Sequence, residues 1–137
     1  MTTRRNFIKT AVAATVGTTA FAQAGKSETR EHAMIKVSVM YPNTPGARFN
    51  HEYYRDKHMP LVKARMGDAC KYYTVDKGLA GGTPDAPATY VAMCHIFSDS
   101  IEAFQAGFGP HTKEITADIP NYTDLSPIIQ ISEVVVG

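Results

Sequence analysis

Strand-like and helix-like stretches follow one another in a fixed order, and this order restricts the fold more than any other feature of the sequence. Residues 34–41 alternate apolar and polar side chains, as a strand does, whereas residues 50–67 repeat apolar side chains at intervals of three and four, as a helix does. Three further segments read as strands, and a second helix lies before the last of them. These strands are residues 69–77, 89–97 and 128–136. The order predicts an α+β, ferredoxin-like β-α-β-β-α-β fold with one four-stranded antiparallel sheet and helices on one face.

The first helix carries a histidine beside a proline. Asn50 suits the N-cap, and Phe49 before it has the spacing of a hydrophobic staple with Tyr54. Pro60 cannot donate a backbone hydrogen bond, so we expect a kink there, with a second short segment that ends near Gly67. The inward face then comprises Tyr54, His58, Leu61, Val62 and Arg65.

The second helix has its own start and stop signals. Ser98-Asp99-Ser100 caps it, and Gly109-Pro110 ends it. The predicted inward stripe comprises Ile101, Phe104, Gln105 and Phe108. A short helical turn follows from His111 to Ala117, before the turn-rich connection to the last strand.

The last strand is apolar on both faces, which predicts a second covering layer. Ile128 and Val134 lie on one face, and Ile129, Ile131 and Val135 on the other. Because helices cover only one side of the sheet, a partner sheet from a second copy is the natural cover for the other side. We therefore expect a homodimer.

The N-terminus has the pattern of an export signal. Arg4-Arg5 precedes a short apolar stretch, Ala11 to Phe21, and Ala22-Gln23-Ala24 is a small-x-small cleavage site. The predicted organisation is a twin-arginine signal peptide at residues 1–24, a flexible leader at 25–33 and one domain at 34–137. The apolar stretch is too short for a stable membrane anchor, which needs ~20 residues. The expected location is periplasmic or extracellular.

Charge and cysteine content exclude several classes of function. Without Arg4, Arg5 and Lys9, the 14 Lys and Arg residues fall to 11 against 13 Asp and Glu, so no basic surface favours nucleic acid. Cys70 and Cys94 lack the spacing of a zinc site. A symmetric hairpin would place them opposite each other, and export would then permit a disulfide, but two free buried thiols are the favoured alternative.

Four stretches together resemble the EthD family of the dimeric α+β barrel superfamily. They are MIKVSVMYPN, YYRDKHMPLV, GLAGG and ADIPNYTDLSPIIQISEV, and the likeness runs from about Met34 to Val135. The resemblance implies side-by-side dimers whose sheets face each other, and a reductase or oxidoreductase that acts on small organic compounds. Related barrels include cofactor-free monooxygenases, polyketide cyclases and lactone isomerases.

His58 is the candidate catalytic residue. The resemblance matches it to the family's KH-x-P histidine, and its ordinary pKa near ~6.5 suits proton transfer at neutral pH. The alternative is a structural histidine bonded to a backbone carbonyl that Pro60 leaves free. A second set of residues could line a substrate pocket between the helices and the sheet, or could equally be core residues with satisfied polar tips. This set comprises Tyr41, Tyr54, His95, Asn121 and Tyr122.

The sequence carries no motif for a metal, a cofactor or a nucleophile. HxxxH, H-E-x-x-H and G-x-S-x-G are all missing, and GLAGGTPDAPA places prolines where a phosphate-binding helix would begin. The leading hypothesis is thus an exported, cofactor-free oxidoreductase or acid–base enzyme for a small hydrophobic oxygenated compound. The alternative is a non-catalytic binding or accessory protein with the same pocket.

Overall fold

The computed structural model describes residues 33–137. The predicted signal peptide and all but the last residue of the predicted leader therefore lie outside the described residues. Four strands and two helical regions follow in the predicted β-α-β-β-α-β order. The strands are β1 (Ile35–Pro42), β2 (Tyr72–Lys77), β3 (Tyr90–Ser98) and β4 (Ile128–Glu133). The helices are α2 (His51–Tyr53), α3 (Met59–Met66), α4 (Ile101–Phe108) and α5 (Thr112–Ala117).

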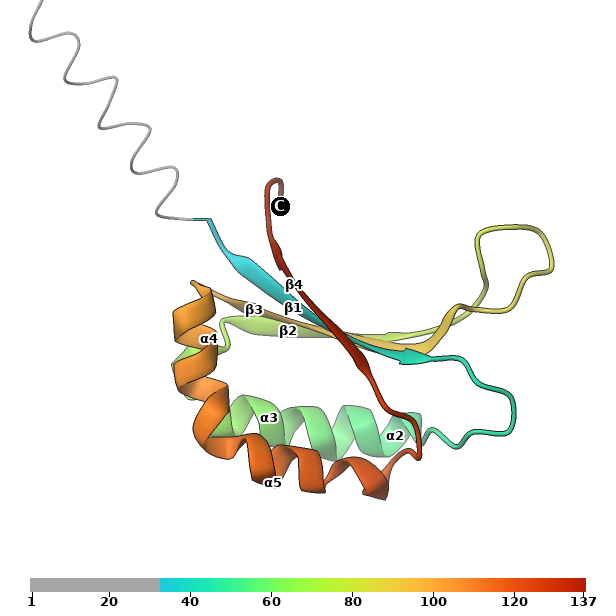
Figure 1. Ribbon diagram of the computed structural model, residues 1–137, viewed down its shortest axis with the longest axis horizontal. Coiled ribbons are helices and arrows are strands. Elements are labelled where there is room, and N and C mark those ends of the chain that lie inside the picture. The colour runs from blue at the N-terminus through green and yellow to red at the C-terminus, as the bar shows by residue number, and fades with distance from the viewer. Residues whose placement is uncertain (1–32) are drawn as a thin grey trace, which may run out of the picture. The chain divides into compact units, whose positions relative to one another are not determined.

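One antiparallel sheet with strand order β2-β3-β1-β4 organises the domain. All the helices lie on one side of it (Figure 1). The strand residues that face the helices pair across the sheet, Val37 with Ile96 and Tyr41 with Ala92, and all four are buried. The core therefore lies between the sheet and the helices, as the alternation of the strands predicts, and the predicted fold class is confirmed.

The first helical region contains a widened turn that the sequence does not predict. Residues Tyr54–His58 form a π-helix between α2 and α3, and the backbone N–H of Met59 bonds to the carbonyl of Tyr54, five residues back. The predicted second segment is confirmed, because α3 has Pro60 in its first turn and ends at the Gly67 cap. The junction is a widened turn rather than a break, since Met59 keeps helical angles of φ −67° and ψ −37°. The proline ring would clash with the carbonyl four residues back, and the wider turn relieves this clash.

The widened turn also changes which side chains point inward. Met59, Val62 and Met66 are buried in α3, whereas Arg65, which was predicted to point inward, is exposed and bonds to Glu114. One extra residue in the turn advances the inward stripe by one position, so the α-helical spacing used for the prediction no longer applies. The predicted cap is confirmed, since Asn50 Oδ1 accepts a hydrogen bond from the Tyr53 N–H at 3.1 Å.

The second helical region follows its prediction in part. Ser100 Oγ caps α4 by accepting the Ala103 N–H at 3.0 Å. Phe104 and Phe108 pack against the core, with their rings stacked at 5.2 Å. Ile101 is 41% exposed and Gln105 is also exposed, so these two predicted members do not belong to the inward stripe.

The hairpin between β2 and β3 is offset from the symmetric register. Cys94 lies opposite Val75, so Cys70 precedes the paired part of β2, and both thiols are free and buried. The symmetric register that would pair the two cysteines is therefore wrong, and the favoured alternative of two free buried thiols is confirmed. The offset arises in the connecting loop, which projects beyond the sheet in Figure 1 and folds on itself through Gly81 N–H to the Ala86 carbonyl. Asp85 there has a left-handed φ of 65°.

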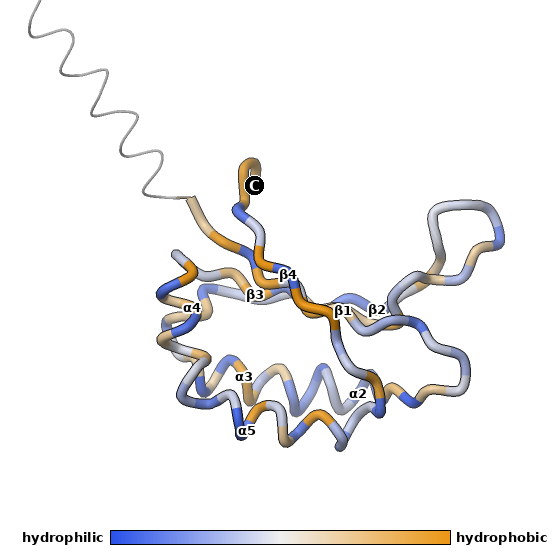
Figure 2. The backbone as a smooth tube through the Cα atoms, viewed as in Figure 1, coloured by the Kyte–Doolittle hydropathy of each residue, from blue (hydrophilic) through white to orange (hydrophobic). Residues whose placement is uncertain are grey.

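The open face of the sheet is of mixed polarity rather than uniformly apolar. Ser38 and His95 lie there as paired residues, beside Met93 and Phe97. The apolar surface is instead concentrated on the edge strand β4, where Ile128, Ile129 and Ile131 are 50%, 60% and 41% exposed. The hydropathy colouring of β4 shows the same trend (Figure 2). No helix within residues 33–137 has the length and apolar character needed to cross a membrane.

Candidate active site

His58 lies at the end of the widened turn, 4% exposed, among aromatic rings. Tyr54 stacks on it from the preceding turn, with ring centroids 5.6 Å apart, and Tyr122 packs against it at 4.6 Å. Its Nδ1 atom lies 2.8 Å from Asp118 Oδ2. The sequence also allowed a structural role, in which His58 bonds to a backbone carbonyl that Pro60 leaves free. His58 Nδ1 instead bonds to the Asp118 carboxylate.

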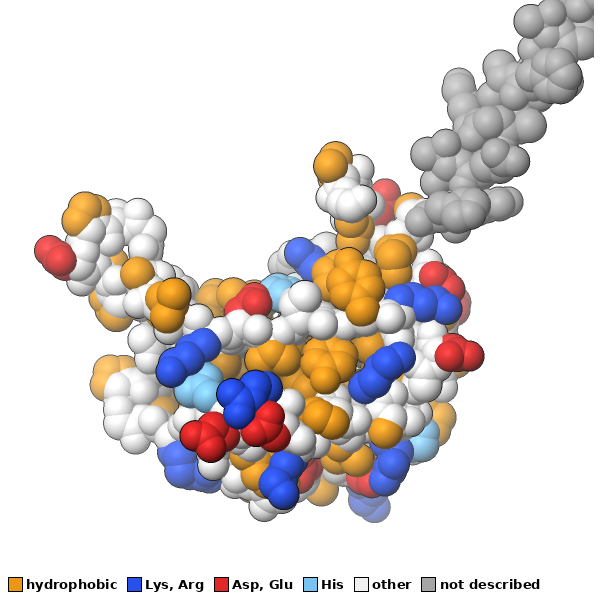
Figure 3. Space-filling model, turned by 180° about the vertical axis from the view of Figure 1, so that it is seen from behind, with side chains coloured by type: hydrophobic (Ala, Val, Ile, Leu, Met, Phe, Trp, Pro, Cys, Tyr) orange, Lys and Arg blue, Asp and Glu red, His pale blue; other side chains and the backbone are white. Residues whose placement is uncertain are grey.

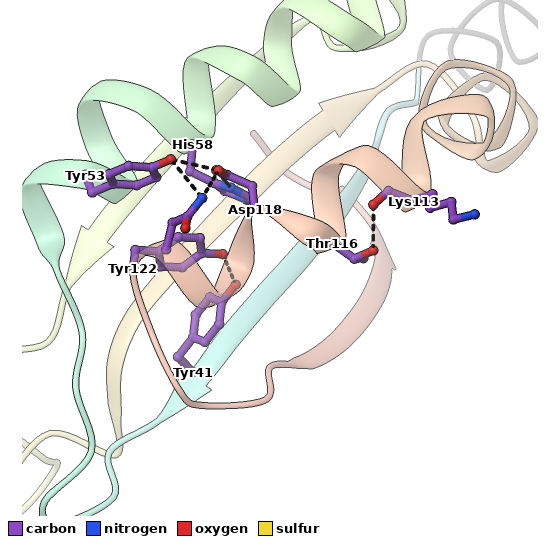
Figure 4. Close-up of polar contacts among 8 residues, drawn as sticks. Tyr41, Tyr53, His58, Lys113, Thr116, Asp118 and Tyr122 are labelled. Atoms are coloured by element: carbon purple, nitrogen blue, oxygen red, sulfur yellow. Dashed lines mark hydrogen bonds and ion pairs between the residues drawn. The ribbon is translucent and has the colours of Figure 1, made fainter.

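Asp118 comes from the other half of the chain, at the end of α5. Its carboxylate accepts the Tyr53 hydroxyl at 2.7 Å and the Asn121 amide at 2.9 Å, both on Oδ1. Figure 4 shows Tyr53 and His58 from the first helical region meeting Asp118 from the second. Three side chains thus form one network around a single carboxylate.

Backbone contacts hold the segment that carries Asp118 against the start of the first helix. The Asn50 N–H donates to the Tyr122 carbonyl at 2.7 Å, and Thr123 Oγ1 donates to the Arg48 carbonyl at 2.6 Å. Phe49 and Thr123 also form an isolated bridge. These bonds attach the Asp118 segment to the backbone beside the Asn50 cap.

Burial and hydrogen bonding set the charges of this pair. Burial lowers the pKa of His58 below its ordinary value, and the hydrogen bond and negative charge of Asp118 offset only part of that effect. Burial alone would raise the pKa of Asp118, but the hydrogen bonds from His58, Asn121 and Tyr53 outweigh it and lower that pKa. At neutral pH an uncharged imidazole therefore faces an ionised carboxylate.

The second ring nitrogen of His58 is available for chemistry. Nε2 makes no hydrogen bond to residues 33–137. In that part of the chain, no side-chain nitrogen or oxygen is both fully buried and without a hydrogen-bond partner. The His58 side chain as a whole is only 6% exposed, so any access to the Nε2 lone pair is narrow.

Two of the predicted pocket residues, Tyr54 and Tyr122, pack against His58, and a third, Tyr41, contacts both of them. Tyr41, Tyr54 and Tyr122 are at most 1% exposed, and the hydroxyls of Tyr41 and Tyr122 lie 2.6 Å apart. Burial raises the pKa of Tyr41 to about 12 and also raises the pKa values of Tyr54 and Tyr122. Their rings fill the space between helix and sheet, so all three phenols stay protonated and can act only as hydrogen-bonding groups.

The other two predicted pocket residues lie elsewhere or have other partners. Asn121 is exposed, and its amide donates to Asp118 and, at 3.4 Å, to the Tyr53 hydroxyl. His95 lies on the open face, across the sheet from His58. There its Nδ1 is 2.8 Å from Ser38 Oγ and its Nε2 is 3.2 Å from Asp76 Oδ2.

Sequence reasoning missed Tyr53 and Asp118. The spacing that selected Tyr54 as the inward residue passed over its neighbour, and Asp118 contacts His58 across 60 positions of sequence. One signal was present, because Asp118 is the only acidic residue in the ADIPNY stretch, three positions before Asn121. Within residues 33–137 no three His, Cys, Asp or Glu side chains gather as metal ligands would.

Comparisons with known proteins agree with this architecture. A model of the EthD domain matches residues 47–126, which include His58 and Asp118. The chain belongs to the EthD family. A crystal structure of an EthD-like protein from Ralstonia eutropha JMP134 is 61% identical, with a TM-score of 0.74, over 77% of this chain and 95% of that one.

A second EthD structure shows how far the fold extends in the family. The ethyl tert-butyl ether D (EthD) family protein from Bacillus halodurans C-125 is 18% identical, with a TM-score of 0.55, over 72% of this chain and 96% of that one. At this identity the likeness concerns the fold alone. A search of curated proteins found no match to this EthD chain.

Proposed function

We propose that this EthD-family chain is an acid–base enzyme for a small, hydrophobic, oxygenated organic compound, with His58 as the proton-transfer residue. The observation that most supports this proposal is the geometry of His58, whose Nδ1 is bonded to Asp118 and whose Nε2 has no partner among residues 33–137. Burial lowers the pKa of His58, which favours the neutral imidazole at pH 7. A buried neutral imidazole with a free nitrogen is a general base, and such groups typically contribute 10²–10⁴-fold to a rate.

The chemistry of the neighbouring groups supports this substrate class. Aromatic rings pack against His58, and within residues 33–137 no Lys or Arg hydrogen-bonds to it or to Asp118. Because Tyr54 and Tyr122 pack against the imidazole, a substrate that reaches Nε2 must displace part of this aromatic packing. Removal of a proton from the carbon beside a carbonyl would be the first step of an isomerisation. Removal of a proton from a phenol or an enol would give the electron-rich anion that dioxygen could oxidise without a cofactor, so both reaction types stay within the proposal.

The test uses the full chain and a panel of simple probes. An enolisable cyclic ketone, a lactone, a phenol and a quinone are incubated in D₂O, and exchange or conversion is followed by NMR and mass spectrometry. His58→Gln should lower the rate ~10²-fold or more. His51→Gln, in the same helical region and outside the network, is the matched control and should keep the rate.

Two outcomes would overturn the enzyme proposal. Equal rates for wild type and His58→Gln would remove His58 from the chemistry. Binding of a probe by the wild type, without exchange or conversion of any panel member, would instead favour the binding or accessory function.

We also propose that the chain works as a homodimer that covers β4 and the open face. The edge strand β4 carries exposed isoleucines on both sides, Ile128 on the open face and Ile129 and Ile131 on the other, and such an edge is adhesive. The polar side chains of the open face satisfy one another through the Ser38–His95–Asp76 chain, so a partner could cover them without leaving them unpaired. Viewed from the back, hydrophobic side chains also form a group on the body of the domain, bordered by Lys and Arg (Figure 3).

Sedimentation of the full chain at micromolar concentration should show two copies. Ile131→Lys on β4 should give single chains with an unchanged circular dichroism spectrum. Ile101→Lys on α4 is the matched control, because both isoleucines are 41% exposed, and it should leave the pair intact. A wild-type chain that sediments alone would contradict the homodimer.

A further inference from the structure

The two oxygens of the Asp118 carboxylate have different hydrogen-bond partners. Oδ1 accepts two hydrogen bonds, from the Tyr53 hydroxyl at 2.7 Å and from the Asn121 amide at 2.9 Å. Oδ2 faces His58 Nδ1 at 2.8 Å. Because Tyr53 and Asn121 hold Oδ1, the carboxylate cannot rotate, and Oδ2 stays directed at the ring (Figure 4).

This arrangement determines which nitrogen of His58 carries the proton. An ionised carboxylate only accepts hydrogen bonds, so Nδ1 must be the donor, and in a neutral ring Nε2 then keeps its lone pair. The other titratable groups close to His58 are the phenols of Tyr53, Tyr54 and Tyr122, of which Tyr53 donates to Asp118. None of these neutral groups opposes the Nδ1–H form.

We propose that Asp118 is the positioning residue of the His58 site: held on Oδ1 by Tyr53 and Asn121, it fixes the imidazole as the Nδ1–H tautomer and so makes Nε2 the base. This inference rests on the proposed function for its catalytic meaning, although the tautomer itself is independent of any substrate. The role differs from that of a stabilising ion pair, which would need a charged imidazole.

The asymmetry of the network makes a sharp prediction for Asp118→Asn. The introduced amide has one oxygen and one NH₂ group. Because Tyr53 and Asn121 both donate at the Oδ1 position, the orientation that keeps both bonds places the amide oxygen there and the NH₂ group opposite His58 Nδ1. Because Nδ1 can then only accept, the proton moves to Nε2, and the base is lost although the shape of the site is unchanged.

The experiment is NMR of the full chain with ¹⁵N-labelled histidine near pH 7.5, where His58→Gln assigns the signals. The wild type should show His58 as Nδ1–H, and Asp118→Asn should show it as Nε2–H. Tyr53→Phe keeps the carboxylate and is the matched control, so it should keep Nδ1–H. Circular dichroism checks the fold of each variant.

Several results would overturn the inference. An Nε2–H ring in the wild type would do so even if Asp118→Asn failed to fold, and so would an Nδ1–H ring in a folded Asp118→Asn chain. With any active probe from the panel, Asp118→Asn should lower kcat ~10²-fold or more with little change in KM. If the tautomers behave as expected but no probe reacts, the proposed function fails and the positioning role stands.

Discussion

The hydroxyl groups of Tyr41 and Tyr122 lie 2.6 Å apart, one at the end of β1 and the other just before β4, and they hydrogen-bond to each other inside the core. Phe49 packs against both rings, at 5.1 Å and 5.4 Å. The pair therefore links the first and last quarters of the domain, and the Tyr122 ring also packs against His58.

Removal of both hydroxyls should cost less than the sum of the two single removals. Tyr41→Phe or Tyr122→Phe leaves a buried hydroxyl without its partner, which we expect to cost about 1–3 kcal/mol of the free energy of unfolding. The double variant removes both groups, so its loss should be smaller than the sum of the single losses. Urea unfolding of the four chains measures the cycle. Strictly additive losses would show that the two hydroxyls do not interact.

Stability should decrease as the pH falls through the histidine range. His58 has a lowered pKa in the folded chain, so below its ordinary value of 6.5 the unfolded chain takes up a proton that the folded chain does not. The contribution of His58 to the free energy of unfolding is fully present above pH 6.5 and is lost as the pH falls to the pKa of His58 in the folded chain. Asp118 also makes the folded chain less stable on acidification, but at lower pH, because its pKa in the folded chain is lowered from 3.8.

Melting temperatures at about pH 7.5 and pH 5.5 test this effect. His58→Asn should show a smaller loss between the two values than the wild type does. His51 also has a lowered pKa, chiefly through burial and secondarily through the charge of Lys77, so part of the loss should remain in the variant. A melting temperature that rises on acidification would contradict the assigned direction.

The cysteines should behave as two protected thiols. Burial raises the pKa of Cys94 to about 11 and also raises the pKa of Cys70, which disfavours the reactive thiolate. Iodoacetamide should therefore modify the folded chain slowly and add two groups in denaturant. The mass of the denatured chain should not change on reduction. A gain of two protons on reduction would reveal a disulfide that the β2–β3 register does not allow for.

The export signal stays a prediction that a simple variant can test. Replacement of Arg4 and Arg5 by lysine keeps the charge but removes the twin-arginine pair, so export by that route should stop. Cell fractionation and the mass of the recovered chain report the location and the cleavage after Ala24. Unchanged export of the double variant would indicate another route.

The sequence predicts the layers of this fold better than its contacts. Alternation in residues 34–41 and 89–97 places Val37, Tyr41 and Ile96 in the core, and the caps Asn50 and Ser100 are where the local chemistry puts them. These features depend on neighbours within a few positions, which a sequence displays directly.

Features that depend on distant or competing interactions were missed. The partner of His58 is Asp118, and neither residue has a local reason to select the other. Pro60 excludes a regular helix, but a kink and a widened turn both relieve its clash, and only packing decides between them. The hairpin offset likewise depends on bonds inside the loop, such as Gly81 to Ala86.

The widened turn at Tyr54–His58 also affects how other members of the family should be compared with this chain. In length it is equivalent to a one-residue insertion in a regular helix. Loss of that residue would rotate every later side chain by about 100° about the helix axis. A homologue that is one residue shorter between its asparagine cap and its histidine would still align well, yet its imidazole would point away from the aspartate. The length of this helix is therefore a better evolutionary marker of the site than the histidine alone.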